Sequence, residues 1–243
     1  MSWTRTYATA RRILEQLRHD PRTLALLLVV PIVLMGLIAW IFPAHDFDQY
    51  GPPLLGIFPM LVMFLVTSVA TLRERTSGTL ERLLAMPLAK ADFIFGYALA
   101  FGVLATLQAV LVSGISFGLF GLEVQGSAAL VGLIAVTDAL LGTALGLFVS
   151  AFAATEFQAV QFMPAILIPQ LLLCGLLLPV DQLPTVLHWL SYAMPMRYTV
   201  EATSVVMTAA TVTSTYWVNL AIVAVFAIGF LGLGAATLRR RTP

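Results

Sequence analysis

Six long apolar runs constrain this chain more than any other feature. Each has roughly the 20 residues that an α-helix needs to cross about 30 Å of hydrocarbon. Because no water reaches that region, a spanning segment must satisfy its own backbone hydrogen bonds, so we expect every run to be helical. The sequence therefore predicts an all-α integral membrane protein with six transmembrane helices. The runs lie near residues 23–42, 53–72, 92–120, 128–153, 158–178 and 216–238.

The composition agrees with this class. Of the 243 residues, 60% are hydrophobic and 10% charged, and the mean hydropathy is +0.95, whereas a soluble domain carries about 25% charged residues. No linker or low-complexity stretch divides the chain, so we expect one transmembrane domain over residues 1–243. The first run is longer than the apolar core of a signal peptide and has no A-x-A exit, which predicts a retained anchor.

The distribution of charge predicts the orientation. Six crossings place 12 of the 13 basic residues on one side: before the first run, between the second and third, and after the sixth. Only Arg197 falls on the other side. Basic segments stay in the cytoplasm, so we expect a multi-pass protein of a bacterial plasma (inner) membrane with both termini cytoplasmic. Aromatic residues gather at the opposite interface, namely Trp40, Tyr50, Trp189, Tyr192, Tyr216 and Trp217.

Residues 4–19 have the pattern of an amphipathic helix. Arginines occupy much of the stretch, and the apolar residues recur at helical spacing, which predicts a helix lying on the membrane surface. Asp20 can cap the first span, and Pro21 fits its first turn. The predicted apolar stripe consists of Tyr7, Ala10, Ile13, Leu14 and Leu17.

The segment 179–215 differs from a solvated loop because it is rich in aromatic residues and methionine. Its prolines predict two short helices that dip into the outer leaflet before the last span. Irregular backbone at that depth has to be covered by protein or line a cavity. We therefore expect Met194, Pro195, Arg197 and Tyr198 to line or gate an exit.

Some chemistries do not fit the residues present. The sole lysine, Lys90, lies in "PLAKAD" without the glycine loop of a P-loop, so this chain cannot hydrolyse ATP by that route. Cys174 is the only cysteine, which excludes a disulfide within the chain. Asp138 is the one ionisable residue well inside a predicted span. It is a candidate for the transport pathway, or else a packing contact with Thr137, Thr143 or Gln108.

The stretch 73–92, "RERTSGTLERLLAMPLAKAD", holds seven of the 25 charged side chains (13 basic, 12 acidic). We expect a turn and then a short helix that ends near Pro87, with Leu80, Leu83 and Leu84 on its apolar face. A solvated turn would explain the arginines but not the apolar ridge, and adjacent spans need only a few connecting residues. A rigid amphipathic helix at the membrane face suits docking into the groove of another protein.

"RERTSGTLERLLAMPL" resembles the cytoplasmic loop of ABC-2 type transporter permeases, especially daunorubicin-resistance-type exporters. In that family the pattern E-R-x-x-G-T-L-E-x-L-x-x-x-P forms a coupling helix that seats on the ATPase subunit. "LPTVLHWLSYAMPMRYTVEA" is similar to the family's P-x-x-Y-x-x-E-A region before the last span. Two residues depart from the pattern: Met194 stands where Asn is common, and Val205 where Arg is common.

The resemblance implies an export permease that is not itself an enzyme. A separate ABC ATPase subunit would bind ATP and Mg²⁺, and this chain would hold no cofactor. A second copy or a paralogous permease would complete the pore within membrane lipid, and we expect no nucleic-acid partner. The implied coupling residues are Glu74, Gly78, Thr79, Glu81, Arg82, Leu83 and Pro87. The implied residues of an outer gate are Pro184, Pro195, Arg197, Tyr198 and Glu201.

Two alternatives remain open from the residues. A proton-coupled secondary carrier would use Asp138, and a membrane assembly factor would transport nothing. The apolar spans favour an amphipathic or hydrophobic cargo, such as a drug, an antibiotic or a lipid. An adjacent gene for a P-loop ATPase would favour the exporter.

Overall fold

The computed structural model describes residues 3–76, 90–211 and 213–237, and within 90–94 the backbone alone. Six of the described helices are long and apolar enough to cross a membrane, and the described residues contain no strand, which confirms the predicted class. The elements in chain order are α1 (Trp3–Arg18), α2 (Pro21–Ile41), α3 (Ala44–Thr76), α5 (Lys90–Gly118), α6 (Ala128–Val149), α7 (Glu156–Leu173), the 3₁₀ turn η1 (Val180–Gln182), α8 (Thr185–Ser191), α9 (Pro195–Thr208) and α10 (Ser214–Thr237).

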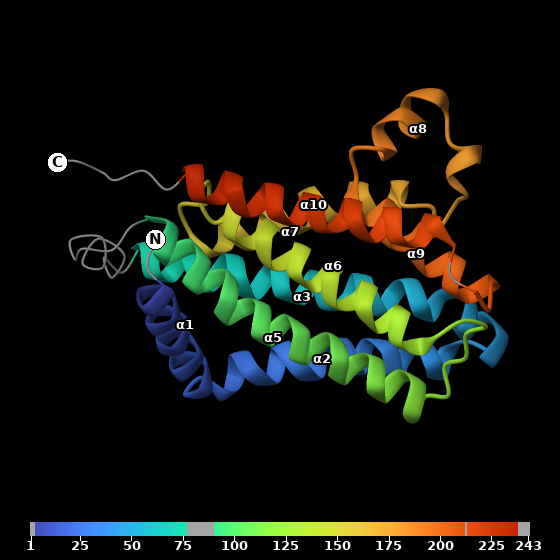
Figure 1. Cartoon of the computed structure of the whole chain (residues 1–243), viewed down its shortest axis with the longest axis horizontal. Coiled ribbons are helices and arrows are strands. Elements are labelled where there is room, and N and C mark those ends of the chain that lie inside the picture. The colour runs from blue at the N-terminus through green and yellow to red at the C-terminus, as the bar shows by residue number, and fades with distance from the viewer. Residues whose placement is uncertain (1–2, 77–89, 212, 238–243) are drawn as a thin grey trace.

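The long helices form a bundle around α3 and α6. Helices α2 and α5 pack on one flank of this pair, and α9 and α10 on the other. The start of α1 and the end of α10 lie at one end of the bundle, whereas α8 and α9 lie at the opposite end (Figure 1). We call the first the basic end, because Arg12, Arg73 and Arg75 lie there, and the second the α9 end.

Two glycines let α6 lie directly against α3. A Cβ added to Gly142 or Gly146 would meet backbone atoms of Met60 or Phe64 of α3 at well under van der Waals distance. The two glycines form a G-x-x-x-G pair, a spacing that permits close helix contact in lipid. The other such pair, Gly114 and Gly118 of α5, has no atom within 4 Å of an added Cβ, so the same spacing does not bring helices together there.

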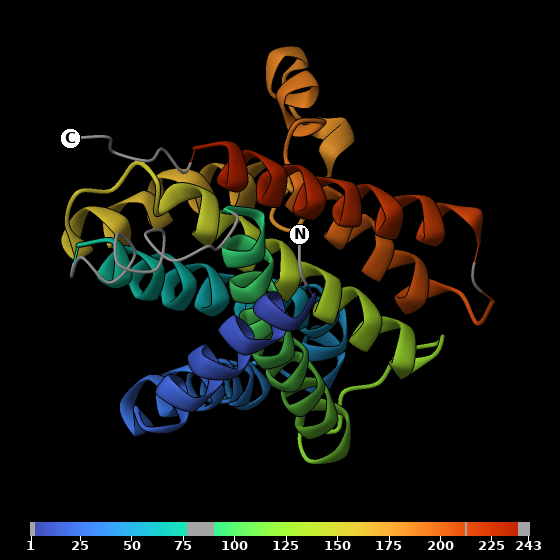
Figure 2. The ribbon, with the colours of Figure 1, turned by 60° about the vertical axis from the view of Figure 1, so that its left-hand side comes forward.

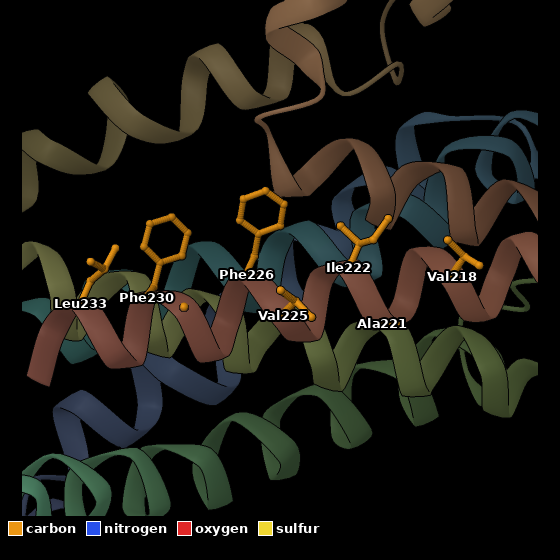
Figure 3. Close-up of a pocket in the computed structure, with 8 residues that line it drawn as sticks. Val218, Ala221, Ile222, Val225, Phe226, Phe230 and Leu233 are labelled. Atoms are coloured by element: carbon orange, nitrogen blue, oxygen red, sulfur yellow. The ribbon is translucent and has the colours of Figure 1, made fainter.

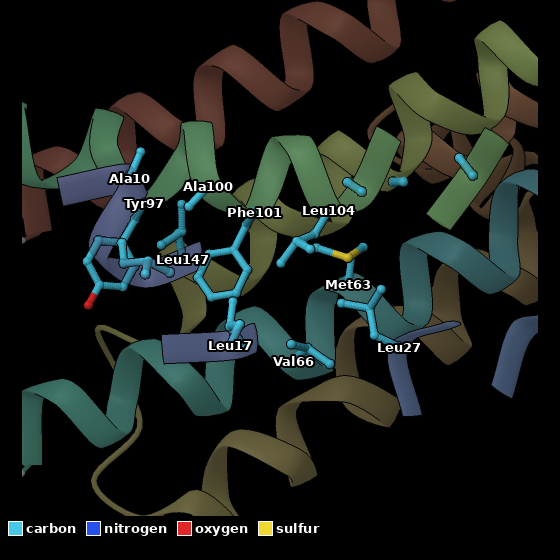
Figure 4. Packing of buried hydrophobic residues seen from close by; sticks show 14 of the residues in the cluster. Ala10, Leu17, Leu27, Met63, Val66, Tyr97, Ala100, Phe101, Leu104 and Leu147 are labelled. Carbon is cyan, nitrogen blue, oxygen red and sulfur yellow. The ribbon is translucent and has the colours of Figure 1, made fainter. Parts of the chain in front are cut away.

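A cluster of buried apolar residues at the basic end joins α1, α2, α3, α5 and α6 (Figure 4). Tyr97 and Phe101 of α5 are 1% and 0% exposed and lie between α1 and α3. The cluster shows that α1 belongs to the bundle and is more than a leader on the membrane surface. Figure 2 shows α1 crossing the bundle beside α5.

The predicted stripe of α1 is correct except at one position. Ala10, Ile13 and Leu17 are buried, but Tyr7 is 65% exposed, so the prediction for Tyr7 was wrong. The reason is that α1 contacts α5 through a different side. A Cβ added to Gly96 of α5 would collide with Thr9, so the closest contact between the two helices runs along Thr6 and Thr9.

The start of α2 has the predicted cap, and its middle contains an unexpected polar contact. Asp20 accepts hydrogen bonds from the backbone and hydroxyl of Thr23, at 3.2 and 2.6 Å. Further along, Pro31 has no N–H to donate to the Leu27 carbonyl four residues earlier. The side-chain amide of Gln108, from α5, donates to that carbonyl at 2.5 Å. A backbone acceptor that proline would leave unpaired inside the membrane is thereby satisfied.

Candidate functional site

At the basic end, the last turn of α3 is bonded to other parts of the bundle. Glu74 accepts from Arg12 of α1 at 3.1 Å, and the same guanidinium lies 3.4 Å from the hydroxyl of Tyr97. The side chain of Glu74 is 14% exposed. An ion pair that water reaches so little is held more firmly than one on an open surface.

The two arginines on either side of Glu74 bind the region where α6 passes into α7. Arg73 forms a two-pronged ion pair with Glu156, the first residue of α7, at 2.7 and 3.0 Å. Arg75 donates to the backbone carbonyl of Ser150, just after α6. The final turn of α3 is thus joined to α1, to α7 and to the turn between α6 and α7.

Of the predicted coupling residues, the structure places Glu74 alone. Helix α3 ends at Thr76, so the chain leaves this bonded turn and enters the predicted coupling segment at once. The remaining coupling residues lie outside the described residues, namely Gly78, Thr79, Glu81, Arg82, Leu83 and Pro87.

At the α9 end, the predicted gate residues form one corner between α8 and α9. Arg197 donates to the Ser191 hydroxyl at 2.6 Å, and its guanidinium lies 3.9 Å from the centre of the Tyr192 ring. The hydroxyl of Tyr198 donates to the backbone carbonyl of Tyr192 at 2.8 Å. These three contacts lock the end of α8 onto the start of α9.

The remaining residues of the predicted gate have simpler positions. Pro184 precedes α8 as its N-cap residue, and Pro195 is the buried first residue of α9. Glu201 is exposed on α9. Helix α9 packs against α3, α6 and α10, whereas α8 stands out from the bundle (Figure 1). The segment contains an additional 3₁₀ turn that the two-helix prediction lacked, and its depth in the membrane stays a prediction.

Asp138 lies at the junction of α3, α6 and α9 and is 0% exposed. Its Oδ1 accepts a hydrogen bond from Thr199 of α9 at 2.9 Å. Gly56 of α3 leaves room for the other oxygen, which would lie 3.2 Å from a Cβ at that position. The packing partner is therefore Thr199, which sequence reasoning missed, because nothing in the spacing predicts that α9 returns to α6.

Three spans remain open to the outside of the bundle. In the most apolar window of α2, α7 and α10, 17%, 22% and 17% of the residues are buried, compared with 56% for α6. A groove of about 590 Å³ runs along α10, and Figure 3 shows its side chains, Phe226 and Phe230 among them. Its lining is almost wholly apolar, as expected of a surface facing lipid or another apolar helix.

This six-span bundle, with a bonded α3 end and a short helical corner before the last span, has the arrangement that the sequence resemblance implied. Residues 4–208 match the family described as ABC-2 type transporter. The chain belongs to that family. It is a multi-pass membrane protein of the ABC-2 type transporter family.

Individual relatives agree with the family assignment. The chain is 32% identical over 170 residues to a probable multidrug ABC transporter permease, YbhR of Escherichia coli K12, covering 68% of this chain and 45% of that protein. It is 25% identical over 209 residues to a second, YbhS, covering 83% and 54%. ABC transporter G family member 20 of Dictyostelium discoideum is 28% identical over 148 residues, covering 61% and 20%. The chain thus spans about half the length of the bacterial relatives that it matches.

Proposed function

We propose that this chain is the transmembrane subunit of an ATP-driven exporter and that a separate ABC ATPase subunit binds ATP and Mg²⁺. The observation that carries the proposal is the last turn of α3. Its three charged residues bond to α1, α7 and the α6–α7 turn, and the next residues are those that resemble a coupling helix. A push on that segment would therefore reach several spans at once.

The mechanism follows from these bonds. Closure of the ATPase subunits would press on the segment that begins at residue 77, and α3 would carry the displacement along its length. The ion pair between Arg12 and Glu74 would move α1, and with it α2, in the same direction. Tilting of α2 and α3 would open the pathway toward the α9 end. In this scheme the coupling residues transmit force, and none of them is catalytic.

A second copy, or a paralogous permease, would complete the pathway. Helix α7 is the least apolar of the six spans, with a mean hydropathy of 1.2 in its most apolar window. Even so, the bundle covers little of it, because only 22% of the residues in this window are buried. Residues at helical spacing along it are exposed, namely Gln161, Pro164, Ala165, Ile168 and Leu172. The least apolar of the spans gains least from contact with lipid, so we assign this face to the partner permease and to the pathway between the two subunits.

Orientation and cargo are part of the same proposal. We place the basic end in the cytoplasm of a bacterial cell and the α9 end outside, because basic segments stay inside. The cargo would be amphipathic or hydrophobic: a drug, an antibiotic or a lipid. Cysteines introduced at positions 5 and 241 should be labelled only after the membrane is permeabilised, and one at position 48 should be labelled in intact cells. The reverse pattern would overturn the orientation.

The decisive experiment addresses the coupling segment. Leu83→Asp and Glu81→Arg should each release the ATPase subunit or uncouple ATP hydrolysis from export, because a charge buried in the partner's groove or reversed against its cations is unfavourable. Each variant is co-expressed with its cognate ATPase subunit, and co-purification and ATP-dependent export into vesicles are measured. Glu15→Gln, on the exposed face of α1, is the control. Wild-type assembly and export in both variants would refute the coupling role.

The corner at the α9 end is tested separately. Arg197→Gln and Tyr198→Phe remove contacts to Ser191 and Tyr192, so we expect altered export with unchanged binding of the ATPase. If these variants lose the ATPase instead, the corner has a structural role and not a gating one.

The proton-coupled carrier receives no support from the position of Asp138. A coupling acid must be reached by water or cargo, and Asp138 is 0% exposed and bonded to Thr199. We propose instead that it fixes α9 on α6.

A further inference from the structure

A cleft of about 410 Å³ opens beside α3 at the basic end. Helices α2 and α7 both pack on α3 but hardly on one another, and the cleft occupies the space between them. Its floor includes Val66 and Val69 of α3, and its walls include Leu26 of α2 and Val160 of α7. Leu26 and Val160 are 60% and 42% exposed, so the cleft opens sideways, toward the hydrocarbon in a membrane.

The closed end of the cleft carries charge. Asp20, Arg73, Glu74 and Glu156 line it together with the apolar residues. Two of these carboxylates are neutralised, because Glu74 binds Arg12 and Glu156 binds Arg73. Asp20 makes no ion pair within the described ranges. Its oxygens accept hydrogen bonds from the hydroxyl and backbone of Thr23, and Arg73 attracts it from beyond ion-pair distance.

Asp20 is ionised at neutral pH. The hydrogen bonds from the Thr23 hydroxyl and backbone hold its pKa below the usual value for a carboxyl group. The cleft therefore combines apolar walls with an excess of one negative charge, because three carboxylates, Asp20, Glu74 and Glu156, stand against the two arginines Arg12 and Arg73. Its volume lies in the range that drug-sized ligands occupy, about 300–1,000 Å³.

We propose that this cleft is a binding site for amphipathic cations that enter sideways from the leaflet at the basic end. The apolar body would lie between Leu26, Val69 and Val160, and the cationic group would lie beside Asp20. A phosphate-bearing lipid head would instead add negative charge to a cleft in which carboxylates already outnumber arginines, which is unfavourable. The inference rests on the proposed export function and names the class of cargo that the permease would accept.

The test uses three probes of nearly the same shape that differ in charge: tetraphenylphosphonium, neutral tetraphenylmethane and anionic tetraphenylborate. The full chain with Val69→Cys is placed in lipid nanodiscs, and the rate of alkylation by N-ethylmaleimide is measured by mass spectrometry. The native Cys174 is 1% exposed, so the introduced thiol is the reactive one. Val225→Cys, on the exposed face of α10 away from the cleft, serves as the control for membrane partitioning.

We expect tetraphenylphosphonium to slow alkylation at position 69 and not at position 225, with little protection from the other two probes. Asp20→Asn removes the charge but leaves an oxygen that caps α2 equally well. It should raise the concentration of tetraphenylphosphonium for half-protection by about fivefold. Glu15→Gln, which removes an acid of α1 outside the cleft, should leave that concentration unchanged.

Three results would overturn the proposal: equal protection by the cation and the anion, protection at position 225 as strong as at 69, or no effect of Asp20→Asn. The experiment needs no ATP and no ATPase subunit, so its outcome is independent of the exporter assignment. Protection without ATP-dependent export would support the binding site and refute the exporter assignment. Export without protection would support the exporter assignment and refute the binding site.

Discussion

Helices α6 and α7 are consecutive spans with opposite surroundings. Helix α6 lies in the middle of the bundle, with 56% of its apolar window buried and two glycines against the backbone of α3. Helix α7 is 22% buried, and Pro164 and Pro169 both lie on its exposed side. The interior of the bundle is thus formed by α3 and α6, whereas α7 presents a surface that the single chain leaves uncovered.

The largest expected loss of stability follows from disrupting the contact between α6 and α3. Gly142→Val should lower the free energy of unfolding by roughly 3 kcal/mol, because its Cβ would overlap the Met60 carbonyl of α3. Thermal unfolding of the detergent-solubilised chain measures the change. Gly114→Val is the matched control, since no atom lies within 4 Å of a Cβ there. Similar losses in both variants would contradict the packing of α6 on α3.

A second change tests the polar contact of α6. Asp138→Ala removes the acceptor for the Thr199 hydroxyl, and a buried donor left unpaired costs about 1–3 kcal/mol. Asp138→Asn keeps an oxygen for that bond, so we expect it to lose less than half as much. The same thermal assay decides. Export that survives in Asp138→Asn would support the packing role, and export abolished in a stable Asp138→Asn protein would instead favour proton coupling.

A third prediction concerns the backbone acceptor that Pro31 leaves unpaired in α2. Gln108→Leu should cost about 1–2 kcal/mol in the wild-type chain, since the Leu27 carbonyl loses its donor. In a Pro31→Ala background, the restored backbone N–H can take over, so the cost should fall by at least half. A double-mutant cycle on unfolding free energies measures the coupling. Additive effects would show that Gln108 does not act through this carbonyl.

The smallest effect on stability is expected on α7. Ala165→Trp adds bulk to an exposed position and should change the unfolding free energy of the lone chain by less than about 0.5 kcal/mol. It should nevertheless lower the yield of the permease pair in cross-linking and reduce export. Val110→Trp, on the exposed side of α5, should alter neither. Equal effects of both substitutions would remove the partner surface from α7.

The six spans and the cap at Asp20 follow from the sequence, because hydropathy and capping act within a few residues of the chain. The second span was expected over 53–72, but its helix is longer and begins at Ala44. The stripe of α1 could be predicted to one residue. What the sequence could not show was which surfaces meet: the two G-x-x-x-G pairs look alike, yet only Gly142 and Gly146 have a helix against them. Partners far apart in the chain, such as Arg73 with Glu156, depend on the packing of whole helices.

The candidate site, too, combines positions that the sequence predicts with contacts that it does not predict. A resemblance placed Glu74 in a force-transmitting loop, and the structure adds its link to Arg12. The positions of Arg197 and Tyr198 in one corner could be expected from their motif, whereas their common dependence on Ser191 and Tyr192 could not. The cleft between α2 and α7 has no linear signature, since its lining comes from five helices.

The length of α3 has a mechanical consequence. Its 33 residues extend about 50 Å at 1.5 Å per residue, well beyond the thickness of a hydrocarbon core. Because Gly142 and Gly146 fix it to α6 along its middle, the two helices form one beam whose basic end is joined to α1 and α7. A small displacement applied beyond Thr76 would turn this beam about its glycine contacts. The opposite arm would then swing α9, and with it the corner at α8, without any span having to bend.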